Sequence, residues 1–375
     1  MEIESSSQQS HHLPEAIIAQ ILSRSPVKSL LRFRCVSKSW GSLIGCQHFI
    51  KMHLQNSIET PSFPQKRVLI RKYEDGMFDI SEMFNWPSPE QCFMCEIDTL
   101  HWPRQCSLLS VLSEPTNTIP LSPFVDPKNT TFCKGYQILG CSNGLLCVLD
   151  TSNRIHLWNP STRISKKLPE ISIMGSRVRK LGFGWVESSG EYKVFVVVEI
   201  NRKLVGKVYS SKTKSWKTIE ICDYSYACRP RGLFAGGKLY WYFGCIIIFL
   251  DLKSEVFGRI EIPYKDIGFK MDYFVGVLGG CLCVLYYNPS FPDRRGLRVS
   301  RVCVMKEAWE EVVTLSHLNE LLQPPLVSLN GEILVDCGST LLVYSARDNV
   351  FRFTKVSSGL RSYVYVESLV SPEDV

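Results

Sequence analysis

LPEAIIAQILSRSPVKSLLRFRCVSKSWGSLIGCQHFIKMHL, residues 13–54, decides how the chain begins to fold. Its apolar residues recur at helical spacing in short runs, which predicts three or four short helices. Pro14 can open the first helix because its missing N–H costs nothing there. Ser25 with Pro26 is expected to start the second helix, and Ser37 to cap the third. Each helix carries more apolar surface than it can bury alone, which is typical of a docking module.

Two other interpretations of this stretch remain open. One is a small three-helix domain with a satisfied core. The other is DNA binding, because basic residues far outnumber the single acidic residue, Glu15. The basic residues are Arg24, Lys28, Arg32, Arg34, Lys38 and Lys51. A DNA-reading helix needs polar side chains that reach base edges, whereas the candidate helix contains Leu30, Leu31 and Phe33. The charge therefore favours an acidic protein partner.

The same stretch resembles an F-box in its plant form. The matching pieces are Leu13-Pro14, Ile17-Ile18, Ile21-Leu22, Ser25 to Leu30, Arg32 to Val36, Lys38 to Trp40 and Phe49. Ser25 stands where the family usually has leucine, and Gly41 where a long polar residue is common. The resemblance implies that the module binds the Skp adaptor of Skp–cullin–F-box ubiquitin ligases and, through it, the cullin and the RING subunit. The implied contact residues, or their support, are Leu13, Pro14, Ile17, Ile18, Ile21, Leu22, Pro26, Leu30, Leu31, Val36 and Trp40.

Composition fits a folded protein with one small module and one large domain. The chain has 375 residues, of which 45% are hydrophobic and 21% charged, and its net charge is +7. Residues 1–10 are expected to form a disordered tail, and they lack the basic and apolar regions of a signal peptide. Fifteen cysteines without an export signal favour free thiols in a reducing compartment. We therefore expect a cytoplasmic or nuclear protein. The longest apolar run, Leu239 to Leu250, is too short to span a bilayer and is interpreted as a buried strand.

From about Phe63 onward, short β-rich runs are separated by turn residues. A glycine turn repeatedly precedes an apolar strand, and a polar turn follows an apolar anchor residue. The distance from glycine to anchor is 14 residues for Gly144 to Trp158 and 13 both for Gly237 to Leu250 and for Gly331 to Tyr344. The unit that begins at Gly280 is longer, and a further anchor, Tyr209, follows Trp158 by 51 residues.

A β-rich repeat of roughly 40–50 residues indicates propeller blades. Trp158, Trp216 and Trp241 are expected to be largely buried at blade seams or within sheets. The fold class is therefore α+β multidomain: a small N-terminal all-α F-box, residues 11–56, followed by an all-β propeller, residues 63–370. Six blades are expected, with seven as the alternative.

Several pieces of this region resemble the F-box-associated domain of plant F-box proteins. They are Gly140 to Cys147, Leu157 to Arg163, Leu181 to Trp185, Glu191 to Val194 and Tyr365 to Pro372. The resemblance implies a kelch-like β-propeller that holds a target protein. Tyr363 to Leu369 is expected to pair with an early strand such as Arg67 to Lys72 and to close the ring.

Chemistry on the chain itself is not expected. Gly140 to Gly144 spells G-x-S-x-G around Ser142, but a hydrolase elbow needs a helix after the serine, and Leu145 to Leu149 is predicted to be a strand. Cys92, Cys95, His101 and Cys106 could supply zinc ligands but lack a second close pair. We expect no metal, no cofactor and no catalysis. The function predicted is that of a substrate receptor of a ubiquitin ligase, which promotes the ubiquitination and degradation of its target, without membrane association. The alternatives are a propeller hydrolase and a nucleic-acid-binding adaptor, the latter suggested by basic residues between Lys166 and Lys180.

Overall fold

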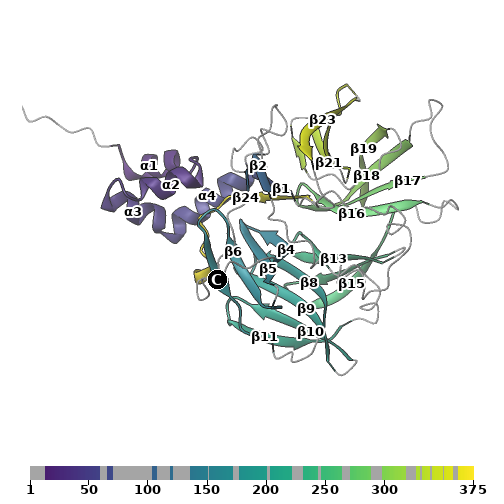
Figure 1. Ribbon diagram of the computed structural model, residues 1–375, viewed down its shortest axis with the longest axis horizontal. Coiled ribbons are helices and arrows are strands. Elements are labelled where there is room, and N and C mark those ends of the chain that lie inside the picture. Colours follow the sequence, from purple (N-terminus) through teal and green to yellow (C-terminus); the bar gives the residue numbers. More distant parts are fainter. Residues whose placement is uncertain are drawn as a thin grey trace, which may run out of the picture.

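The computed structural model contains a helical module followed by a β-propeller (Figure 1). It describes residues 13–59, 66–70, 104–107, 119–120, 136–150, 152–171, 177–200, 203–221, 231–243, 246–263, 271–288, 298–317, 327–329, 332–337, 340–348, 350–357 and 362–375. The helices are α1 (Glu15–Leu22), α2 (Val27–Phe33), α3 (Lys38–Gly45) and α4 (Gln47–Glu59). A short 3-10 helix, η2 (Pro372–Asp374), follows the last strand.

The helix starts follow local rules with one exception. Pro14 precedes α1, and the hydroxyl of Ser37 accepts a hydrogen bond from the Trp40 backbone N–H at 3.1 Å, so Ser37 caps α3 as predicted. The expected Ser25 cap of α2 is wrong. The N-cap position is Pro26, and no side chain caps that helix. The Ser25 carbonyl instead lies 3.1 Å from His53 Nε2 on α4, so a tertiary contact fixes this junction.

Five four-stranded antiparallel sheets are each built from consecutive strands. The first contains β4 (Tyr136–Ser142), β5 (Leu145–Asp150), β6 (Ile155–Asn159) and β7 (Ile164–Lys167). The second contains β8 (Arg177–Val186), β9 (Glu191–Ile200), β10 (Lys203–Ser210) and β11 (Ser215–Ile219). The third contains β12 (Leu233–Ala235), β13 (Lys238–Phe243), β14 (Ile246–Asp251) and β15 (Val256–Glu261). The fourth contains β16 (Asp272–Leu278), β17 (Cys281–Tyr287), β18 (Arg298–Met305) and β19 (Trp309–His317). The fifth contains β20 (Val327–Leu329), β21 (Glu332–Asp336), β22 (Thr340–Ser345) and β23 (Val350–Ser357).

One further four-stranded sheet joins the two ends of the domain. It contains β24 (Ser362–Val366), β1 (Lys66–Ile70), β2 (Arg104–Ser107) and β3 (Ile119–Pro120), in that order. In the antiparallel pair of β1 and β24, Arg67 faces Tyr365 and Ile70 faces Ser362. The predicted pairing of the C-terminal strand with an early strand is therefore confirmed. The pairing joins two strands that would otherwise be exposed sheet edges.

The repeat seen in the sequence corresponds to fixed places in the sheets. Gly144, Gly237 and Gly280 have φ of 78°, 76° and 80°, and each lies in the turn between the first and second strands of its sheet. Gly331 lies outside the described residues. The anchor residues all lie on third strands and are buried. They are Trp158, Tyr209, Leu250 and Tyr344.

The hydrophobic core lies at the seams between neighbouring sheets. One cluster joins Leu157 of β6 with Val196 of β9, and another joins Phe195 of β9 with Leu250 of β14. Clusters of the same kind join the third sheet to the fourth and the fourth to the fifth. First strands also contact one another, β4 with β8, β8 with β12 and β12 with β16, so these strands lie innermost. This is the arrangement of a propeller, in which each sheet is covered by its neighbours.

Two interpretations of the sequence need correction. Leu239 to Leu250 is not one strand, because β13 ends at Phe243 and β14 begins at Ile246. Of the three tryptophans expected in the core, Trp158 and Trp241 are buried, whereas Trp216 is half-buried. Trp216 lies on the outermost strand β11, and its indole N–H donates to the Pro169 carbonyl at 2.8 Å. Among the described residues, no helix combines the length and apolarity needed to cross a bilayer.

Candidate docking surface

Four aliphatic side chains of the helical module, Leu13, Ile17, Ile21 and Val36, are exposed, and we call them the exposed stripe. Leu13, just before α1, is 59% exposed, and Ile17 and Ile21 of α1 are 41% and 57% exposed. Val36, between α2 and α3, is 64% exposed. Ile17 and Ile21 are four residues apart, which places them one above the other on the same face of α1. Branched aliphatic side chains clustered in this way are costly to leave in water, and the cluster therefore suits a protein contact.

The residues predicted to bind or support a partner divide into three groups by burial. Exposed residues are Leu13, Pro14, Ile17, Ile21, Pro26 and Val36. Half-buried residues are Ile18, Leu31 and Trp40, and buried residues are Leu22 and Leu30. The structure thus places the exposed group where a partner can reach it, whereas the buried pair belongs to the core beneath.

The core beneath the stripe contains one residue from outside the module. Its buried members are Leu22, Val27, Leu30, Ile44, Phe49 and Leu369. Phe33 and Trp40 pack at its edge with their ring centroids 5.8 Å apart in an edge-on arrangement. The local sequence around Leu369 gives no sign that this residue belongs to the core of the module.

Helix α4 fixes the junction between α1 and α2 through buried polar groups. His53 is fully buried, its ring stacks on Phe49, and its Nε2 lies 3.1 Å from the Ser25 carbonyl. Burial lowers the pKa of His53. The hydrogen bond with the Ser25 carbonyl raises that pKa, but by less. Asn56 Nδ2 donates to Ser23 Oγ at 2.8 Å. These contacts were also missed, because polar residues in a helix give no sequence signal that distinguishes burial from exposure.

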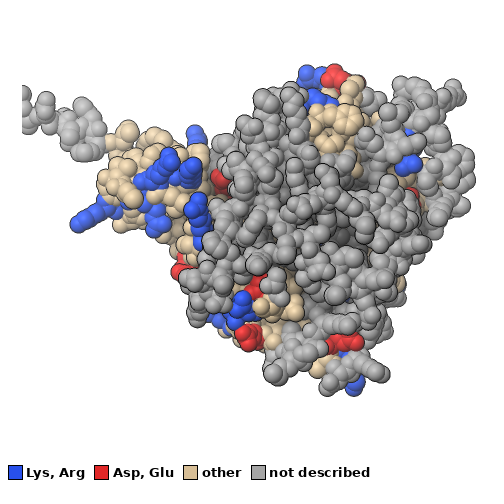
Figure 2. Space-filling view, in the orientation of Figure 1, with Lys and Arg blue, Asp and Glu red and all other residues tan. Residues whose placement is uncertain are grey.

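Basic side chains are exposed on the same helical module. Figure 2 shows lysine and arginine side chains gathered over the helical module. The exposed basic residues of the module are Arg24, Lys28, Arg32, Arg34, Lys38 and Lys51. Exposed apolar side chains on a module whose exposed charges are mostly positive favour a partner of negative charge.

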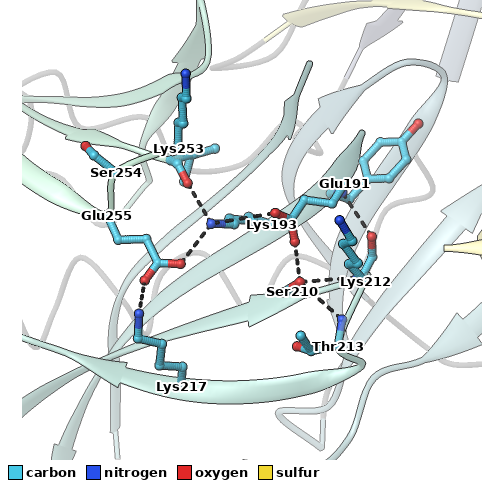
Figure 3. Close-up of polar contacts among 12 residues, drawn as sticks. Glu191, Lys193, Ser210, Lys212, Thr213, Lys217, Lys253, Ser254 and Glu255 are labelled. Atoms are coloured by element: carbon cyan, nitrogen blue, oxygen red, sulfur yellow. Dashed lines mark hydrogen bonds and ion pairs between the residues drawn. The ribbon is translucent and has the colours of Figure 1, made fainter. Parts of the chain in front are cut away.

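The propeller that carries the module is tied together by polar contacts between sheets. In Figure 3, Lys193 of β9 extends toward the turn between β14 and β15. Its ammonium group donates to the Leu252 carbonyl and to Glu255, both at 2.8 Å. Glu255 also pairs with Lys217 of β11 at 2.7 Å. One carboxylate of the third sheet thus pairs with two strands of the second.

Other sequence-based candidates have structural roles or fall outside the described residues. Ser142 is followed by the two-residue turn Asn143-Gly144 and then by strand β5, so the strand–turn–helix geometry of a hydrolase elbow is not met. Lys166 donates to the Val375 carbonyl, and Lys167 pairs with Glu170 at 2.6 Å. The cysteine and histidine cluster lies outside the described residues except for Cys106 on β2.

Both modules match known protein families. Residues 10–51 match the F-box domain family, and residues 106–371 match the family described as the F-box associated beta propeller domain. The chain belongs to the F-box-associated propeller family. The two resemblances seen in the sequence are thereby confirmed, and the architecture is that of a plant F-box protein.

Relatives of this F-box protein share its full layout. F-box/kelch-repeat protein At3g23880 of Arabidopsis thaliana is 26% identical over 396 residues, which cover 97% of each chain. F-box protein CPR1 of the same plant is 25% identical over 409 residues, which cover 96% of this chain and 88% of that relative. The similarity therefore extends over both the helical module and the propeller.

Proposed function

We propose that this F-box protein is the substrate-recognition subunit of a Skp–cullin–F-box ubiquitin ligase. The observation that carries the proposal is the exposed stripe of Leu13, Ile17, Ile21 and Val36 on an otherwise packed module. A stripe of this kind supplies the buried anchors that dominate interface energies. Through the Skp adaptor the chain would reach the cullin and the RING subunit.

The charge of the module supports an acidic adaptor. The exposed arginines and lysines of the module would steer such a partner and speed its association at low salt. A rise in ionic strength should accordingly slow association more than it speeds dissociation.

In this proposal the propeller binds a protein target and does no chemistry. A receptor accelerates ubiquitin transfer by holding a target lysine near the charged enzyme, which raises the effective concentration. This role requires a rigid scaffold. We propose that the sheet formed by β24, β1, β2 and β3 acts as the sixth blade of a closed ring.

The site of action would be the cytoplasm, the nucleus or both, and the outcome would be degradation of the target.

Co-purification with the Skp adaptor tests the proposal. Replacing Leu13 and Pro14 together with alanine should abolish co-purification while the thermal unfolding of the propeller stays as in the parent. The matched control is Ile58→Ala, which removes an exposed isoleucine of α4 outside the predicted contact set. Undiminished adaptor binding by the double variant would contradict the proposal.

A further inference from the structure

Residues 367–375, which we call the tail, lie between the helical module and the β4–β7 sheet. Figure 1 shows this C-terminal segment passing beside α4 and β6. The tail begins where β24 ends and finishes with η2, which contacts β6 and β7. It therefore reaches both parts of the protein after the propeller has closed.

The tail is attached to the helical module by an apolar and a polar contact. Leu369 is buried in the core of the module with Phe49 and Ile44. Gln47, at the start of α4, donates from Nε2 to Asp374 Oδ2 at 3.1 Å. Among the described residues, Leu369 is the only buried member of that core that does not come from the module.

On the propeller side, Asn159 holds the tail. Its side-chain N–H group donates to the Ser368 carbonyl at 2.9 Å and to the Val370 carbonyl at 2.8 Å. Asn159 is fully buried. Val370 and Val375 pack against the core cluster shared by the first and second sheets, so apolar contacts accompany the hydrogen bonds.

Comparison with the other sheets shows what is special about Asn159. The residue after each described anchor accepts hydrogen bonds within its turn: Asn159 Oδ1 from Ser161 N at 2.9 Å, and Asp251 Oδ1 from Lys253 N at 2.9 Å. Ser210 and Ser345 do the same through their hydroxyls. An aspartate could therefore complete the turn. Only an amide side chain can accept hydrogen bonds from the turn and also donate two hydrogen bonds to the tail carbonyls.

We propose that the tail is an orientation clamp, in which Asn159 and Leu369 are positioning residues that hold the helical module in one orientation on the propeller. Its consequence for ubiquitin transfer rests on the proposed function, because a fixed orientation would set where a bound target lysine stands relative to the ligase. The clamp itself is a property of this chain and can be measured without any partner.

Single-molecule energy transfer on the full chain tests the clamp. Dyes are placed at two exposed positions, Ser42 on α3 and Glu307 in the β18–β19 turn. They are attached through genetically encoded non-natural residues, because the fifteen cysteines exclude thiol labelling. The parent should give one narrow distribution of transfer efficiency.

Two variants test the clamp, one by a substitution in the propeller and one by a substitution in the tail. Asn159→Asp keeps the turn acceptor but sets a carboxylate against two carbonyl oxygens, and Leu369→Asp removes the apolar contact with the module. Both should broaden and shift the distribution. The matched controls are Asp251→Asn, the reverse exchange in an equivalent turn, and Phe353→Asp, at an exposed position on β23. Both controls should keep the parent distribution.

Two further readouts distinguish loss of the clamp from general unfolding of the chain. Asn159→Asp should retain the far-ultraviolet circular dichroism and the Skp-adaptor affinity of the parent while its distribution broadens, although its melting temperature falls because the new carboxylate is buried. A narrow, unshifted distribution in both tail variants would overturn the clamp. If the parent fails to bind the adaptor, the proposed function fails, whereas a broadened distribution in the tail variants alone still supports the clamp.

Discussion

Lys193 and Glu255 form an ion pair across a sheet seam, with Lys193 Nζ 2.8 Å from Glu255 Oε1. The Lys193 side chain is 7% exposed, and its ammonium group also contacts the Leu252 carbonyl and, at 3.9 Å, the Glu191 carboxylate. Burial alone raises the pKa of the Glu255 carboxyl, but hydrogen bonds from Lys193 and Lys217 bring that pKa below its ordinary value. The carboxylate therefore stays ionised and joins two sheets.

Removing one member of this pair should destabilise the propeller. Glu255→Gln removes the nearer of the two carboxylates that pair with Lys193 and leaves only Glu191, at 3.9 Å, so we expect the free energy of unfolding to fall by about 2 kcal/mol. Lys217 is 71% exposed, so Lys217→Ala should cost less than about 1 kcal/mol. Urea unfolding of both variants checks the difference, and equal effects would contradict the seam role of Lys193.

Gly144 allows the tail to pass close to the β4–β5 turn. A Cβ at this position would lie 2.2 Å from Ser368 Oγ and 2.6 Å from the Val366 carbonyl. Gly280 has a similar positive φ in the equivalent turn, but nothing lies within 4 Å of its Cβ position. Gly280→Ala should cost about 1–2 kcal/mol for the backbone conformation alone, and Gly144→Ala should cost more. If thermal unfolding gave the same loss of stability for Gly144→Ala and Gly280→Ala, the tail would not be in close contact with the β4–β5 turn.

The core tryptophans should differ in their importance. Trp158→Ala and Trp241→Ala remove buried side chains and should each lower stability by about 3–5 kcal/mol. Trp216→Ala, at a half-buried edge position, should cost clearly less. Differential scanning calorimetry of the three variants gives the ranking. A melting temperature within a degree or two of the parent for Trp158→Ala would contradict the strand register.

Asp150 should make the first sheet sensitive to acid. Burial raises the pKa of its carboxyl, but hydrogen bonds from His156 and Arg154 outweigh that effect and lower the pKa to about 2. A pKa below that of the unfolded chain, about 3.9, stabilises the fold above that pH, and the stabilisation is lost as the pH falls toward 2. Asp150→Asn should remove about 2 kcal/mol at pH 7 and flatten the loss of stability between pH 4 and pH 2. An unaltered pH profile in chemical unfolding would refute this role.

The sequence predicted those features that depend on local patterns. Helix α3 follows from Ser37 and its apolar face, and the buried anchors Trp158 and Tyr209 follow from the repeat. The candidate docking residues were proposed by resemblance and not from local pattern, because the exposure of Ile21 and Val36 depends on how the helices pack.

Contacts between segments that lie far apart in the sequence could not be predicted from local patterns. Leu369 contacts the helical module, and Asn159 binds the neighbouring tail carbonyls, although these residues lie far apart in the sequence. Nothing in the local sequence of either residue predicts its partner. The predicted Ser25 cap was wrong because Pro26, and not Ser25, occupies the N-cap position of α2. Residues whose role depends on tertiary contacts of this kind are found only in the folded chain.

Hydrogen exchange of the full chain with and without the Skp adaptor tests the central claim most directly. The account predicts slower exchange, on adding the adaptor, in α1 and around Val36, where the exposed stripe lies, and unchanged exchange in the propeller strands. Protection confined to the propeller, or no protection anywhere, would contradict the assignment of the helical module as the adaptor-docking surface.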